Sequence, residues 1–123
     1  MYPEALFAIL DVTQVRTEFG TPVRIYPFGD APPNVVRPYV VHQLVAGTPL
    51  NCIDEPPPMD DERIQFSVWG DADTQVAAAA KALRTQLQQY GYINSYSDAG
   101  RDPETKRYGI ILDWSRLEPW PIP

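Results

Sequence analysis

Two residues of this sequence could carry nucleophilic chemistry, its one histidine and its one cysteine. A catalytic cysteine needs a base at hydrogen-bond distance and a third group that orients the base. His42 is flanked by Val41 and Gln43, which offer no relay, and Cys52 lies further on in a proline-rich stretch. We therefore interpret His42 as a strand residue facing solvent or a neighbour, and Cys52 as a small, partly buried hydrophobic residue. A lone cysteine also excludes an internal disulfide and a cysteine-based zinc site.

A cluster of acidic side chains could supply the oxygen ligands that Ca²⁺ and Mg²⁺ prefer. The cluster comprises Asp54, Glu55, Asp60, Asp61 and Glu62. Consecutive prolines divide it, and it lacks the glycine and the alternating spacing of a calcium-binding loop. We expect a solvated acidic loop that holds no metal.

The common catalytic and phosphate-binding motifs are missing. The sequence contains no GxGxxG, GxxxxGK[ST], GxSxG or HExxH. Dinucleotide binding, P-loop chemistry, serine hydrolysis and zinc proteolysis therefore lose their usual support. We predict no catalytic residue and no cofactor.

Composition indicates an ordinary globular chain, which we interpret as one domain over residues 1–123. Of its 123 residues, 44% are hydrophobic and 21% are charged. The net charge of −6 repels phosphate backbones, and no lysine or arginine cluster offsets it, so direct nucleic-acid binding is not expected. No apolar run reaches the ~18 residues of a membrane span. The opening MYPEALFAILDV lacks the basic start of a signal peptide, which indicates a cytoplasmic chain.

Hydrophobic spacing and turn residues predict an α+β fold, with a mostly antiparallel sheet and helices on one face. Prolines and glycines separate the expected elements. These are a helix over 3–18, strands over 23–27 and 38–48, a long proline-rich acidic connection over 48–62, a strand over 63–69, a helix reaching about residue 90, and strands over 92–100 and 107–120.

The stretch RIQFSVWGD, residues 63–71, shows the clearest local pattern. Its alternation places Ile64, Phe66 and Val68 on one strand face and leaves Trp69 on the other. Gly70 then allows a turn. The strand should be buried on one side only.

An alanine-rich helix is predicted directly after this strand. Asp71 or Asp73 could accept a hydrogen bond from the first amides of that helix. Its apolar stripe consists of Val76, Ala80, Leu83 and Leu87, and Gly91 provides a C-terminal stop. The alanines keep the helix thin, so it can approach a sheet or a neighbouring subunit closely.

Several segments in this order resemble one family. The segments are RIYP at 24–27, PYVVHQLVAGTP at 38–49, RIQFSVWGD at 63–71, the alanine-rich helix, and DPETKRYGIILDW at 102–114. Together they resemble the tail-completion or tail-terminator proteins of long, non-contractile-tailed bacteriophages (siphophages) and prophages. The resemblance covers almost the whole chain.

The resemblance implies structural work without catalysis. Such proteins form a ring, typically a hexamer, on the head-proximal end of the tail tube, where they stop tube growth and meet the head connector. The implied partners are further copies of the chain, the tail tube protein and the connector, with no membrane. The implied location is the virion tail after assembly in the host cytoplasm, with the genome passing through the pore.

The family has no short signature, so the expected interface residues come from the pattern of this chain. A ring closed head to tail uses two different patches on each subunit. One expected patch is the outer side of strand 63–69, and the thin helix and the 48–62 loop are candidates for the other. Tyr96 and Arg101 complete the expected interface residues. The full set is Arg63, Gln65, Trp69, Asp60, Asp61, Glu62, Tyr96 and Arg101. If the three acids line the pore, they would repel DNA and let it slide.

Three other interpretations remain open at this stage. A neck or head-completion protein of similar size would bind the portal or connector instead of the tube. A small ligand-binding α+β module would need an apolar pocket between helix and sheet. An enzyme is the interpretation that the sequence favours least.

Overall fold

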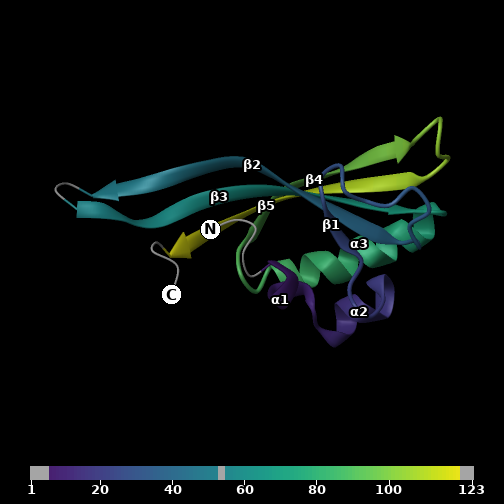
Figure 1. Cartoon of the computed structure of the whole chain (residues 1–123), viewed down its shortest axis with the longest axis horizontal. Helices are drawn as coiled ribbons and strands as arrows, with labels where there is room; N and C mark the ends of the chain where they lie inside the picture. The colour runs from purple at the N-terminus through teal and green to yellow at the C-terminus, as the bar shows by residue number, and fades with distance from the viewer. Residues whose placement is uncertain (1–5, 53–54, 120–123) are drawn as a thin grey trace.

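The computed structural model describes residues 6–52 and 55–119, which form helices on one side of a single sheet (Figure 1). The helices are α1 (Leu6–Leu10), α2 (Thr13–Phe19) and α3 (Asp73–Leu87). The strands are β1 (Ile25–Pro27), β2 (Tyr39–Cys52), β3 (Glu55–Gly70), β4 (Tyr92–Arg101) and β5 (Tyr108–Pro119).

The five strands lie in the order β1-β2-β3-β5-β4. The β1 strand pairs with β2 in parallel, and all the other neighbours are antiparallel. In the centre, Phe66 lies opposite His42 on one side and Leu112 on the other. This arrangement confirms the predicted α+β fold, its mostly antiparallel sheet and its helices on one face.

The core lies between the helices and the central strands. The alternation predicted for strand 63–69 is confirmed, because Ile64, Phe66 and Val68 are all fully buried. The predicted stripe of α3 also faces inward. The remaining core comes from both short helices and from β2 and β5, with Leu6, Leu10, Val15, Phe19, Val40, Leu112 and Trp114 the most buried.

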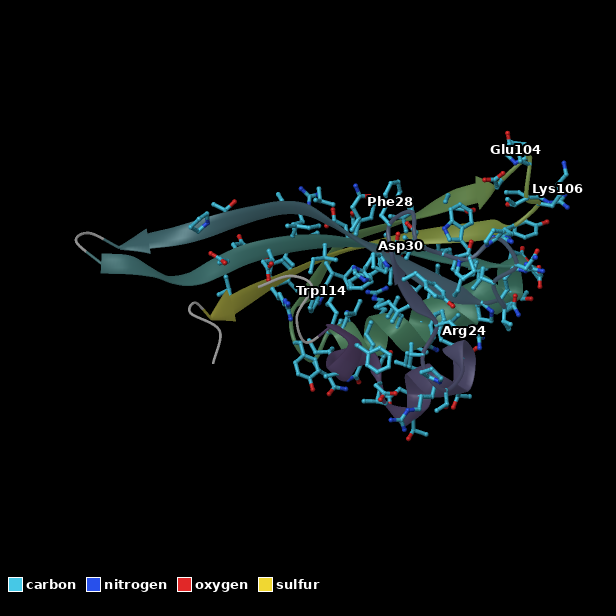
Figure 2. All side chains as sticks on the ribbon, in the orientation of Figure 1. Arg24, Phe28, Asp30, Glu104, Lys106 and Trp114 are labelled. Carbon is cyan, nitrogen blue, oxygen red and sulfur yellow. The ribbon has the colours of Figure 1, made fainter. Side chains whose placement is uncertain are left out.

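Trp114 joins the sheet to the end of α3 (Figure 2). Its indole Nε1–H donates a hydrogen bond to the Leu87 carbonyl oxygen at 2.9 Å, and its ring meets Phe66 edge-on at 5.9 Å. A Cβ on Gly91 would lie 2.3 Å from the Ser115 carbonyl oxygen and 2.7 Å from the indole nitrogen. Gly91 is therefore required by this close approach; α3 itself ends earlier, at Leu87.

The single helix predicted over 3–18 is wrong in one respect, because two helices occupy the described part of that range. The chain leaves the α-helical conformation at Asp11 and Val12. Arg16 Nε donates to Asp11 Oδ1 at 2.7 Å, and this hydrogen bond lowers the pKa of the Asp11 carboxyl group. Gly20 follows α2 with a φ of 84°, so it ends the helix as expected. Residues 3–5 lie outside the described residues.

The predicted aspartate that accepts a hydrogen bond from the first amides of α3 is confirmed, and it is Asp73. Ala72 occupies the N-cap position and makes no side-chain cap hydrogen bond. Asp71 instead accepts a hydrogen bond from Arg37, and Asp73 lies in the first turn, where its carboxylate accepts from the Thr74 amide at 2.8 Å. An acidic residue in the first turn still favours the helix dipole.

The long connection predicted over 48–62 is a pair of strands in the described residues. Thr48 lies opposite Asp61, Pro49 opposite Asp60, and Cys52 opposite Glu55. Proline fixes φ near −65°, which an extended strand accommodates, so a run of prolines interrupts hydrogen bonds without forcing a loop. We call the paired residues 46–52 and 55–62 the arm; it extends well beyond the helices (Figure 1).

Candidate assembly surface

No helix of the described residues covers the face of the sheet opposite α1, α2 and α3 (Figure 1). We call it the bare face; its central residues are Gln43, Gln65, Arg63, Ser67, Ile111 and Asp113. Arg63 Nε donates to both carboxylate oxygens of Asp113 at 2.9 Å, and Asn94 donates to one of them at 3.2 Å. The Arg63 hydrogen bond is the main reason that the pKa of Asp113 lies below its usual value. The bare face is therefore polar, with its central charges paired.

Trp69 lies on the bare face, as the strand alternation predicts, but its ring is half-buried. It packs over β5, where a Cβ on Gly109 would lie 2.7 Å from indole Cζ3. Trp69 also lies opposite Tyr39 of β2. Much of its apolar area is thus used within the chain.

The acids of the arm do not lie together on one face. Glu62 and Arg116 point to the helix side, where Glu62 Oε1 lies 3.5 Å from Arg116 Nη2 and both side chains are almost fully buried. Asp60 is only 8% exposed, whereas Asp61 belongs to the bare-face register and is half-buried. The expected solvated loop is wrong for Asp60 and Glu62, because β5 lies beside β3 and buries both side chains, and it supplies the cation Arg116 beside Glu62.

The possible metal and nucleophile residues can be placed only in part. Within residues 6–52 and 55–119, no group of three or more His, Cys, Asp or Glu side chains could hold a metal ion. Asp54 and the side chains of Glu55 and Cys52 lie outside what is described. His42 is buried on the helix-side face, and this burial lowers its pKa.

The β4 strand forms one edge of the sheet, and nearly every residue along it is exposed. It carries Tyr96, which is 66% exposed and lies under the Arg84 guanidinium at 5.1 Å. It ends at Arg101, which stacks over Tyr108 at 5.5 Å. The two predicted interface residues of this strand thus lie at an edge, far from the arm.

The opposite edge is only partly covered. The β1 strand pairs with Val40, Val41 and His42 and ends there. Beyond it, no strand within the described residues pairs with the outer side of β2 from Gln43 onward. We call the segment Gln43–Pro49 the open β2 edge.

A groove runs between α3 and the β4 edge. Its volume is about 310 Å³, and its lining includes Asp73, Val76, Tyr96, Asp98, Tyr108 and Ile110. The interior between helix and sheet, by contrast, is filled by fully buried side chains such as Phe66 and Trp114. The pocket required for a ligand-binding module would therefore have to be this lateral groove.

Among the described residues, the sheet has one polar face without a helix and two edges without a full strand partner, and a free edge can pair with another chain. No helix in the described residues is long and apolar enough to cross a membrane. The family model described as Tail completion protein gp17 matches residues 4–117, and the chain belongs to this family. It is therefore a structural protein of the virion tail, without enzymatic activity, that assembles with other virion proteins.

A solved structure has the same fold. A chain of the "Virion of native gene transfer agent (GTA) particle" is similar with a TM-score of 0.65 and 16% sequence identity, covering 95% of this chain and 98% of that chain. At this identity the likeness shows the fold alone. Among curated proteins, none matches the chain.

Sequence reasoning missed three features of this surface. Arg116 and Asp113 pair with Glu62 and Arg63 on opposite faces of the same two strands. The available signal for these pairs was an acid and a base three positions apart on a strand, Asp113 and Arg116, which places them on opposite faces. The open β2 edge had a signal as well, since the segment 43–49 has no charged residue.

Proposed function

We propose that the chain is a tail terminator, which closes into a ring on the head-proximal end of the tail tube. The ring would stop growth of the tube and present a surface to the head connector. Membership of the tail completion family and the fold shared with a gene transfer agent virion chain support this role. The proposed partners are further copies of the chain, most simply six, the tube protein and the connector protein.

One observation carries the ring. The sheet ends in two different free edges, β4 on one side and the open β2 edge on the other. A contact between unlike patches of identical subunits is heterologous, and it closes into a ring when the rotation between subunits allows. A self-matching dimer patch would instead need one surface that complements itself.

We further propose that the bare face lines the channel of the ring. Its central charges are paired as Arg63 with Asp113, and Asp61 is the arm acid that belongs to this face. Of the three acids considered for the pore, Asp60, Asp61 and Glu62, we therefore keep only Asp61. Asp60 is buried, and Glu62 is buried against Arg116. A polar lining without unpaired cations would not hold phosphate groups, which suits passage of DNA.

Light scattering over a wide range of protein concentrations tests the proposal. A closed species of about six subunits is expected, in solution or on purified tail tubes during co-sedimentation. A chain that stays monomeric and does not sediment with tubes would refute the proposal. Binding to connector and not to tubes would place the chain elsewhere in the neck.

A further inference from the structure

We propose, on the basis of the ring proposed above, that the subunits join by strand addition. The open β2 edge, Gln43–Pro49, of one copy pairs with the free β4 edge, Tyr92–Arg101, of the next copy. The sheet then continues from subunit to subunit. The occupant of each free edge is thus a second copy of this chain.

The chemistry of the open β2 edge favours this pairing. Natural edge strands are usually protected by charge, by proline, by bulges or by short length. The β1 strand follows that rule, with three residues ending in Pro27. The segment 43–49 has no charged side chain, and Leu44 and Val45 are 39% and 49% exposed. Its protection is limited to a register shift between Leu44 and Ala46 and to Pro49 at its end. An edge without charge and with exposed aliphatic side chains favours pairing with another chain.

The β4 edge is a suitable acceptor. It is ten residues long and contains no proline, so each backbone amide on its free side can donate. Its two bulges, at Ile93/Ser95 and Asp98/Gly100, still leave the intervening residues in regular register with β5. Its one acid and one base leave no net charge to repel the uncharged segment 43–49.

Strand direction agrees with ring closure. The successive antiparallel pairs β2/β3, β3/β5 and β5/β4 make β4 antiparallel to β2. Rotation about an axis roughly along the strands preserves strand direction from copy to copy. The β2 strand of the next copy therefore meets β4 as an antiparallel neighbour, which is the more stable kind of pair.

The register within the sheet also agrees with closure. Ser97, in the middle of β4, pairs with Ile111 of β5. Ala46, in the middle of the open β2 edge, pairs with Arg63, which in turn pairs with Ser115 of β5. The two middles are therefore offset by about 14 Å along the strands, while the four strand spacings from one β2 to the next measure about 19 Å across the sheet. The resulting strand tilt is about 35°, which falls at the lower end of the range found in closed β-barrels.

The same register matches the two faces of the joined sheet. Ala46 and Ser97 both belong to the bare face, because their register partners Arg63 and Ile111 do. Leu44 lies opposite Ile64 and so belongs to the helix side. An added strand would place such a side chain over the groove beside α3, where Tyr96 is exposed and Tyr108 and Ile110 are partly buried.

Two edge variants and a matched control test the inference. Val45→Lys and Ser97→Lys each place a charge at one of the two edges, while Val36→Lys makes the same change at a site that is 64% exposed and lies outside both edges. We expect both edge variants to shift completely to the monomer mass at concentrations where the wild type and Val36→Lys are fully assembled. Circular dichroism establishes that each variant is folded.

A cross-link tests the register directly. In a Cys52→Ser background, Ala46→Cys with Ser97→Cys should oxidise to a ladder of covalent oligomers that stops at the ring size, whereas either single cysteine should give at most dimers. If Val45→Lys still forms rings and the double-cysteine variant gives no ladder, the proposed strand pairing is wrong, while the ring itself stands. A wild-type chain that never assembles, even on tubes, would overturn both proposals. The pairing would also be wrong if Ser97→Lys leaves the rings unaffected and an extended peptide from another virion protein binds at β4. That result would assign the β4 edge to a different partner.

Discussion

The buried pair Glu62–Arg116 at the base of the arm should couple strongly in stability measurements. Both side chains are almost fully buried, and Glu62 Oε1 lies 3.5 Å from Arg116 Nη2. Replacing either residue by methionine keeps most of the volume and removes one charge of the pair. Replacing both removes the two charges together.

The distance sets the size of the effect. At 3.5 Å and an effective dielectric constant of about 20, the attraction between unit charges is about 5 kcal/mol. Removing one partner of a buried pair costs about 3–5 kcal/mol, whereas replacing both by apolar residues is often neutral or stabilising. Arg116 also lies over the Trp114 ring at 5.5 Å, so Arg116→Met should lose about 0.5–1 kcal/mol more than Glu62→Met.

Urea unfolding at one protein concentration measures these changes. At a slope of about 2 kcal/mol per molar, each single variant should lower the midpoint by about 1.5–2.5 M, and the double variant should stay within about 0.5 M of the wild type. Additive losses in the double variant would show that the two charges do not interact. Single variants that lose less than about 1 kcal/mol would show that water solvates the pair.

Two further predictions concern packing and pH. Gly91→Ala should lower the free energy of unfolding by about 1–3 kcal/mol, since its Cβ would meet the Ser115 carbonyl oxygen at 2.3 Å. The control Gly47→Ala has nothing within 4 Å of its Cβ and should be nearly neutral. Thermal unfolding compares the two variants, and equal losses would contradict the close packing at Gly91. Burial lowers the pKa of His42 in the folded chain, so below about pH 6.5 the unfolded state binds a proton that the folded state does not, and stability should fall as pH drops through this range. The His42→Asn variant should lack that fall, and an unchanged pH profile would assign it to other groups.

Local patterns were sufficient for the elements that bury one face. Each of these elements has one buried face and one face toward solvent, which leaves a periodic pattern in the sequence. The strand was predictable from the alternation in residues 63–69, and the helix from the spacing of Val76, Ala80, Leu83 and Leu87. The resemblance to tail-completion proteins was likewise confirmed by the family match over residues 4–117.

The arm could not be predicted, because its evidence is not local. Prolines and acids in residues 48–62 are typical of loops, but pairing with β2 and β5 holds the described part as strand. The burial of Glu62 depends on Arg116, far along the chain. The separation of Asp60 and Glu62 from Asp61, onto opposite faces, follows once that strand pairing is known.

The strand order and the two free edges were also beyond the sequence pattern. Nothing in VRIYP shows that β1 covers only Val40, Val41 and His42 of β2. The interface residues predicted on strand 63–69 and on residues 92–101 remain a prediction, and the structure assigns them to the bare face and to the β4 edge. Assembly through those surfaces is the part that experiment must decide.

The most direct measurement is electron microscopy of headless tails incubated with gold-labelled protein. The proposed function predicts one label cluster per tail, at the end opposite the tail tip, with a stoichiometry of about six. Labels along the tube, at the tip, or absent from tails that are known to lack their terminator would contradict it.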